Sequence, residues 1–152
     1  MIQRIQTIFL LAAIACISAM SYLHVAELVT TDASIYIFNL RGYFHETAGG
    51  ALERELNCWS LFAMAQLINL FLLATIFLFK HRIVQMRLCV YNMILSLGLM
   101  GMTFFVVSHT SNVSMVAYKA PVVFPAVAFI LILLAFRAIR RDHILTQFDR
   151  LR

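Results

Sequence analysis

The sequence predicts an all-α membrane protein, a bundle of four transmembrane helices, from three observations. The 152 residues are 62% hydrophobic, with a mean hydropathy of +0.88. Only 12% are charged, against roughly 25% in an ordinary soluble domain. Residues 56–79 and 88–108 are two uncharged apolar runs joined by a basic turn. A helix rises about 1.5 Å per residue, so each run is long enough to cross a hydrocarbon core about 30 Å thick.

The four helices are expected within a single membrane domain that covers residues 1–152. Their predicted ranges are about 5–24, 53–79, 88–108 and 121–140. Pro121 suits the start of the fourth helix, because proline is tolerated in a first helical turn. Residues 25–52 and 109–120 are then outer loops, and residues 141–152 form a basic amphipathic tail at the cytoplasmic surface.

The first outer loop carries a strand-like segment. Residues 34–44 mix β-branched and aromatic side chains with Asn39 and Gly42, a composition that favours strands around a turn. A short β-hairpin on the membrane surface is the prediction. The alternative is an irregular interfacial loop, because aromatic rings also favour the headgroup layer.

Positive charge is distributed unequally between the two sides of the predicted bundle. One side receives three basic residues, and the side with both termini receives nine: Arg4, Lys80, Arg82, Arg87, Arg137, Arg140, Arg141, Arg150 and Arg152. The excess marks the cytoplasmic side, so both termini are predicted to be cytoplasmic in a multi-pass protein of the cell inner membrane. The basic residues behind the formal charge of +5 are therefore expected to set the membrane orientation, and nucleic acid is not an expected partner.

Five polar residues lie within the apolar runs of the second and third helices, and they are predicted to make interhelical polar contacts: Gln66, Asn69, Asn92, Ser96 and Thr103. Asn69 and Ser96 are at similar depth and are expected to hydrogen-bond across the hairpin. Alternatively, Gln66, Asn69, Asn92 and Thr103 line the polar lumen of a small oligomeric solute carrier. The absence of charged residues from these runs argues against that alternative.

Histidines suggest a second alternative, a haem- or metal-binding redox bundle. His24 ends the first helix and His109 ends the third, so both would lie at the outer face. An interfacial position for an amphipathic ring explains both equally. The sequence shows no hydrolase triad, phosphate-binding glycine loop or paired cysteines. We therefore predict no catalytic residues, no cofactor, no metal site and no enzymatic activity.

The two ends of the chain resemble a known family. The start Met1-Ile-Gln-Arg-Ile-Gln-Thr7, the stretch Ala138-Ile-Arg-Arg-Asp142 and the closing Asp149-Arg-Leu-Arg152 are similar to those of a domain-of-unknown-function family. The members of that family are small four-helix inner-membrane proteins typical of Bacteroidota. The resemblance implies the same architecture and carries no activity with it.

The function predicted from the sequence is that of a non-catalytic accessory or scaffold subunit of a larger membrane complex. Its expected partners are membrane lipid and another membrane protein or further copies of the chain. The basic residues near the C-terminal end of the chain are expected to face lipid or a partner, because arginine beside an anionic membrane surface is favourable: Arg137, Arg140, Arg141, Arg150 and Arg152.

Overall fold

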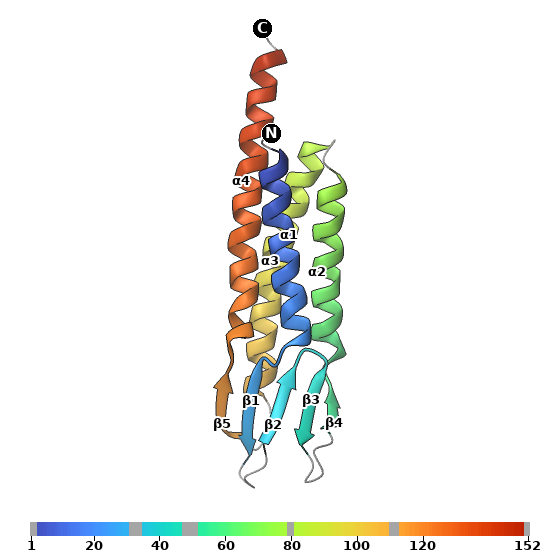
Figure 1. Cartoon of the computed structure of the whole chain (residues 1–152), viewed down its shortest axis with the longest axis vertical. Coiled ribbons are helices and arrows are strands. Elements are labelled where there is room, and N and C mark those ends of the chain that lie inside the picture. The colour runs from blue at the N-terminus through green and yellow to red at the C-terminus, as the bar shows by residue number, and fades with distance from the viewer. Residues whose placement is uncertain (1–2, 31–34, 47–51, 79–80, 110–112, 151–152) are drawn as a thin grey trace.

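The computed structural model describes residues 3–30, 35–46, 52–78, 81–109 and 113–150. Within these ranges the chain forms a helical bundle with a small β-sheet at one end (Figure 1). The elements follow in the order α1 (Gln3–Tyr22), β1 (Ala26–Thr30), β2 (Ile35–Asn39), β3 (Gly42–Glu46), β4 (Leu52–Asn57), α2 (Trp59–Phe77), α3 (Arg82–Ser108), β5 (Val113–Tyr118), the 3₁₀ turn η1 (Ala120–Val123) and α4 (Phe124–Arg150).

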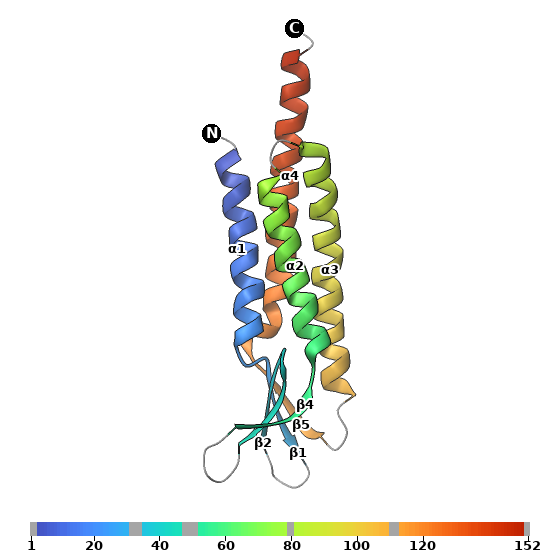
Figure 2. The same cartoon turned by 90° about the vertical axis from the view of Figure 1, so that its right-hand side faces the viewer.

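The four described helices are long and apolar enough to cross a membrane, as expected of a multi-pass membrane protein. Helix α1 packs against α2 and α4, and α3 packs against the same two helices (Figures 1 and 2). The helices therefore form a square in which α1 is diagonal to α3 and α2 is diagonal to α4. Each helix buries one stripe of small and branched apolar side chains, among them Ala13, Ile17, Ala65, Ile68, Leu99, Ala128 and Ile132. Such stripes allow the close packing that holds helices together in lipid.

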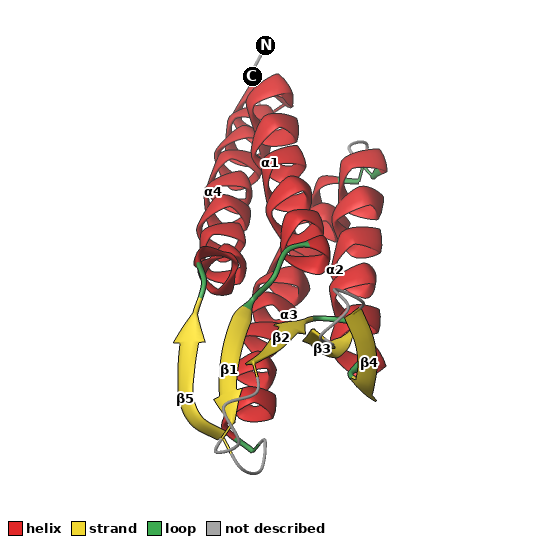
Figure 3. Cartoon of the chain, turned by 60° about the horizontal axis from the view of Figure 1, so that its bottom comes forward, coloured by secondary structure: helices red, strands yellow, loops and turns green. Residues whose placement is uncertain are grey.

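The sheet is antiparallel, with strand order β4-β3-β2-β1-β5. Strand β1 pairs with β2 through Ala26 and Phe38, and with β5 through Ala26 and Tyr118. Because β5 lies between α3 and α4, the sheet joins the segment that connects α1 to α2 with the segment that connects α3 to α4 (Figure 3). The predicted hairpin is thus confirmed as β2–β3, and it is part of a larger sheet.

The turn between β2 and β3 has a local cause. The Oδ1 atom of Asn39 accepts hydrogen bonds from the backbone N–H groups of Arg41 at 2.9 Å and of Gly42 at 3.2 Å. Gly42 has a φ of 151°, a conformation that a residue with a Cβ rarely adopts. An asparagine that closes its own turn and a glycine after it explain why the chain reverses here.

The structure differs from four of the predicted boundaries. Residues 53–57 were expected to begin the second helix, but they form β4, because backbone pairing with β3 outweighs their local helix preference. Residues 109–120 were expected to be a loop, yet residues 113–118 form β5. The third helix begins at Arg82, six residues earlier than predicted, and α4 continues to Arg150 without a break, so the described part of the tail 141–152 extends this helix.

The sheet docks on the ends of the helices through its central hairpin. Phe38, Leu40 and Tyr43 are buried, and the Tyr43 hydroxyl donates a hydrogen bond to the carbonyl of Val106 in α3 at 3.3 Å. The Arg41 guanidinium lies 5.1 Å from the ring centre of Tyr22 in α1 and 5.0 Å from that of Phe62 in α2. These contacts fix the hairpin against three helices.

Candidate functional site

Three polar residues of α3 are buried and donate hydrogen bonds within their own helix, although the Oδ1 atom of Asn92 has no partner in the described part of the chain. The side chains of Asn92, Ser96 and Thr103 donate to backbone carbonyls of their own helix, at 2.9, 2.9 and 2.7 Å. Short polar side chains commonly bond to a carbonyl three or four residues back. These donated bonds therefore stay within α3 and do not cross to α2.

Asn69 makes the contact between helices that its depth suggested, but with a different partner. Its side-chain amide donates to the Ser18 hydroxyl of α1 at 3.2 Å. The predicted hydrogen bond between Asn69 and Ser96 is wrong, because the Asn69 Oδ1 atom has no partner among the described residues and Ser96 donates to the carbonyl of Met93. Asn69 therefore links α2 to α1, the helix that precedes the predicted hairpin.

Gln66 does not lie where the sequence interpretation placed it. It is exposed on the outside of the bundle, whereas Asn69 is buried. The interior stripe of α2 is Leu61, Ala65, Ile68, Asn69, Leu72 and Thr75. Gln66 belongs to the opposite stripe, which we call the outer face of α2 and which comprises Ala63, Gln66, Leu70, Leu73 and Phe77. The four polar residues assigned to a carrier lumen consequently do not share one surface.

The depth of Gln66 makes its exposure costly. It follows the first residue of α2, Trp59, by seven residues and precedes the last, Phe77, by eleven. These separations place it about 10 Å and about 16 Å from the two helix ends, well inside the hydrocarbon layer. Gln66 has no hydrogen-bond partner in the described part of the chain. A primary amide in hydrocarbon without a partner costs several kcal/mol, at about 2–7 depending on the reference state.

The outer faces of α3 and α4 contrast with that of α2. At comparable positions α3 exposes Ile94 and Leu97, and α4 exposes Ile130 and Leu134. These side chains are apolar and are satisfied by lipid tails. In the described part of the chain, the outer face of α2 is therefore the helix surface that exposes an amide without a hydrogen-bond partner.

The two histidines of the redox alternative are both exposed. His24 lies between α1 and β1, and His109 ends α3, where its ring stacks on Phe105 with centroids 4.3 Å apart. The described residues contain no group of three histidine, cysteine or carboxylate side chains that could hold a metal ion. The His109 ring therefore packs on an aromatic neighbour, and such amphipathic rings are common at a membrane boundary.

Cys58 lies directly before α2 and is half-buried. Burial raises the pKa of the Cys58 thiol above its ordinary value of 9.0. A raised pKa lowers the thiolate fraction at neutral pH, and the thiolate is the nucleophile. Cys58 is therefore mainly a protonated thiol at neutral pH.

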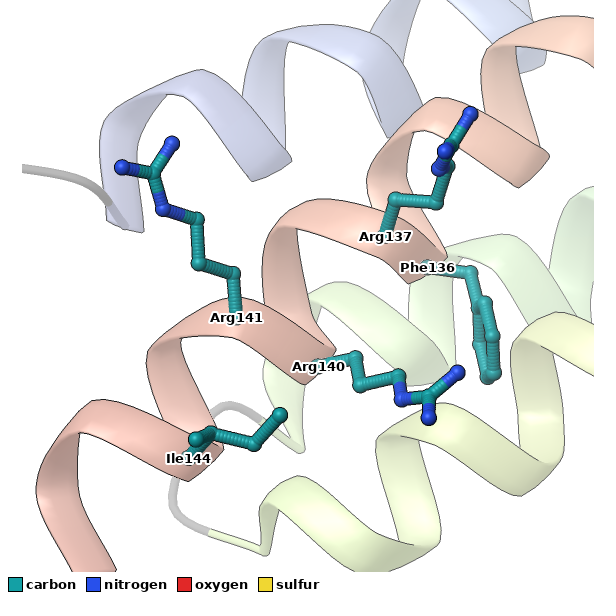
Figure 4. A pocket seen from close by; sticks show the side chains of 5 residues that line it. All are labelled: Phe136, Arg137, Arg140, Arg141 and Ile144. Atoms are coloured by element: carbon teal, nitrogen blue, oxygen red, sulfur yellow. The ribbon is translucent and has the colours of Figure 1, made fainter. Parts of the chain in front are cut away.

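Basic residues gather where α4 leaves the bundle. Arg137, Arg140 and Arg141 are exposed on this helix and line an open groove of about 290 Å³ together with Phe136 and Ile144 (Figure 4). The other two predicted basic residues cannot be placed in the same way, because the Arg150 side chain and the whole of Arg152 are outside the described residues.

Comparison with known protein families identifies the family of this chain. The model of a domain of unknown function, DUF4293, matches residues 2–151, which is nearly the whole chain. No curated protein matches the sequence.

Proposed function

This chain belongs to the DUF4293 family, and we propose that it is a non-catalytic accessory or scaffold subunit of a larger membrane complex. The outer face of α2 is the surface that holds it there. Its partner is a transmembrane helix of another membrane protein that offers a hydrogen-bonding side chain at the depth of Gln66. The exposed amide of Gln66 is the single observation that carries this proposal.

In a membrane, forming a hydrogen bond and leaving a polar group unpaired have unequal free energies. A hydrogen bond between helices in a membrane contributes only about 0.6 kcal/mol on average. Leaving an amide without a partner in hydrocarbon costs more than that. The free protein therefore exposes an unsatisfied group, and binding of a polar partner helix relieves it. Ala63 lies almost one turn before Gln66, and its small side chain allows another helix to approach this face closely.

The proposed orientation follows from charge. The end of the bundle with the described beginning of α1 and the end of α4 carries most of the basic residues, and the sheet lies at the opposite end (Figure 2). We place the basic end in the cytoplasm and the sheet outside, in the inner membrane of a bacterium. The resemblance of the two chain ends supports a bacterium of the Bacteroidota.

A pull-down in mild detergent tests the proposal. The tagged wild-type protein and two variants, Gln66→Leu and Asn69→Leu, are purified from native membranes and compared by mass spectrometry, with an absorption spectrum of each sample. We expect a stoichiometric membrane partner with the wild type and with Asn69→Leu, whose amide faces the interior. Gln66→Leu should weaken retention about threefold to thirtyfold, which corresponds to about 0.6 to 2 kcal/mol.

Three results would contradict the proposal. The wild type could purify alone, it could purify only with further copies of itself, or Gln66→Leu could retain the partner as well as the wild type does. A haem absorption band would instead favour the redox alternative with His24 and His109. The Gln66→Asn variant, which keeps an amide, should retain the partner better than Gln66→Leu does.

A further inference from the structure

A groove runs along the exposed side of α4 between two rows of side chains. Arg137 and Arg141 form one row, and Phe136, Arg140 and Ile144 form the other, each with a spacing of four residues (Figure 4). Residues four apart are neighbours on a helix surface, so each row is continuous. We call this feature the arginine groove. It has three guanidinium groups and an apolar side chain towards each end.

The charge of the arginine groove is not neutralised by the nearest carboxylate. Asp142 follows Arg141, but its carboxylate forms an ion pair with Arg82 at 3.0 Å. Arg82 also donates to the backbone carbonyl of Asp142 at 2.8 Å, so α3 holds this carboxylate from the side of the bundle. Within the described residues, no acidic side chain forms an ion pair with the three groove arginines. The three guanidinium groups of the groove are therefore available to an anionic ligand.

The arginine groove lies at the end of a membrane span. The apolar span of α4 extends from Ala120 to Asp142, and the helix continues beyond the ends of the other helices (Figures 1 and 2). Arginine side chains at a span end reach towards the headgroup layer. Phe136 is half-buried one residue before the first groove arginine, on the membrane side, where acyl chains begin.

We propose that the arginine groove binds the phosphate group of an anionic phospholipid. Guanidinium groups recognise phosphate through charge-assisted hydrogen bonds, and a row of them beside a membrane favours a lipid headgroup. Phe136 gives the lipid chains an apolar contact that free phosphate could not use. This inference is independent of the proposed function, because it concerns α4 and lipid, and neither α2 nor a protein partner.

Native mass spectrometry of the purified full chain tests this proposal. Delipidated protein is titrated with phosphatidylglycerol and, separately, with phosphatidylcholine. The variants are the triple substitution Arg137→Gln, Arg140→Gln and Arg141→Gln, and a control, Arg87→Gln, which removes an exposed arginine of α3 outside the groove. We expect one phosphatidylglycerol to bind the wild type and the control alike, and the triple variant to bind about a hundredfold more weakly, at about fivefold per arginine.

The single variant Arg140→Gln, which alters one exposed residue and leaves the fold intact, should lose about fivefold. Three outcomes overturn the proposal. Arg87→Gln could weaken binding as much as Arg140→Gln does, which would indicate diffuse attraction by net charge. Phosphatidylcholine could bind as tightly as phosphatidylglycerol. Millimolar inorganic phosphate could displace the lipid completely, which would identify free phosphate as the ligand.

Discussion

The two sides of α2 treat polar groups differently, although the helix is apolar along its whole length. On the interior side, Asn69 is buried and donates to Ser18 of α1. On the outer face, Gln66 lies three residues earlier and finds no hydrogen-bond partner in the described part of the chain. The fold thus gives the buried Asn69 amide one hydrogen bond, while its Oδ1 atom has no partner in the described structure. The exposed Gln66 amide has none there, and this difference is why we propose that the outer face of α2 is an assembly surface.

The largest expected effect on stability comes from a comparison of two leucines on opposite sides of α2. Leu72 is 0% exposed and Leu70 is 63% exposed on the same helix. Leu72→Ala should lower the free energy of unfolding by about 2–5 kcal/mol, because it leaves a cavity in the core. Leu70→Ala should change it by less than about 0.5 kcal/mol. Unfolding of the purified monomer by a denaturing detergent measures both. Equal losses would mean that Leu70 is packed as tightly as Leu72, which would contradict the assignment of Leu70 to an outer face.

Substitution of the amide side chains on the two sides should change the free energy of unfolding by less. The Oδ1 atom of Asn92 is buried and lacks a hydrogen-bond partner in the described structure. Asn92→Leu should therefore change the free energy of unfolding by only about 1 kcal/mol in either direction, since it removes an unsatisfied acceptor together with one local hydrogen bond. Gln66→Leu should leave the unfolding of the monomer unchanged and weaken only assembly. A loss above about 3 kcal/mol for Asn92→Leu would show that this amide has an essential partner.

An exposed ion pair on the sheet is expected to have the smallest effect on stability. Lys119 and Glu27 pair across β1 and the end of β5, with side chains 43% and 37% exposed. Exposed pairs of this kind contribute about 0 to 1 kcal/mol and are screened by salt. Glu27→Gln should thus lower thermal stability slightly at low ionic strength and by still less in concentrated salt. A large effect that persists in salt would show that the pair fixes the β1–β5 junction.

Cys58 reports on packing at the junction between the sheet and α2. Its raised pKa favours the protonated thiol in the folded protein, so this contribution to stability is present below the unfolded pKa of 9.0 and is lost as the pH rises through the higher folded pKa. At pH 8 iodoacetamide should alkylate Cys58 more slowly in the folded protein than in the denatured chain. Peptide mass spectrometry over time measures both rates, and equal rates would mean that the thiol is fully solvated.

The membrane spans could be predicted from the sequence because hydrocarbon thickness sets a length that uncharged runs must meet. The face of each helix could not be predicted as well. Helix α2 is apolar on all sides, so nothing in its pattern distinguishes the interior side of Asn69 from the outer side of Gln66. The phase of such a helix is decided by its neighbours, and those contacts have no local signal in the sequence.

The sheet shows a second limit of sequence reasoning. The hairpin β2–β3 has its own signals in Asn39 and Gly42, and it was predicted. The pairing of β1 with β5 was not predicted, because it brings together Ala26 and Tyr118, which are far apart in the chain. The clamp of Arg41 between the rings of Tyr22 and Phe62 likewise depends on three separate elements.

Photocrosslinking in native membranes tests most directly whether the outer face of α2 is an assembly surface. A photoreactive phenylalanine analogue replaces, one at a time, Leu70 of α2, Ile94 of α3 and Ile130 of α4, which are 63%, 62% and 55% exposed. We predict a discrete adduct with another membrane protein at position 70, and lipid adducts alone at positions 94 and 130. Lipid adducts alone at position 70, or the same protein adduct at all three positions, would contradict the assignment of this face.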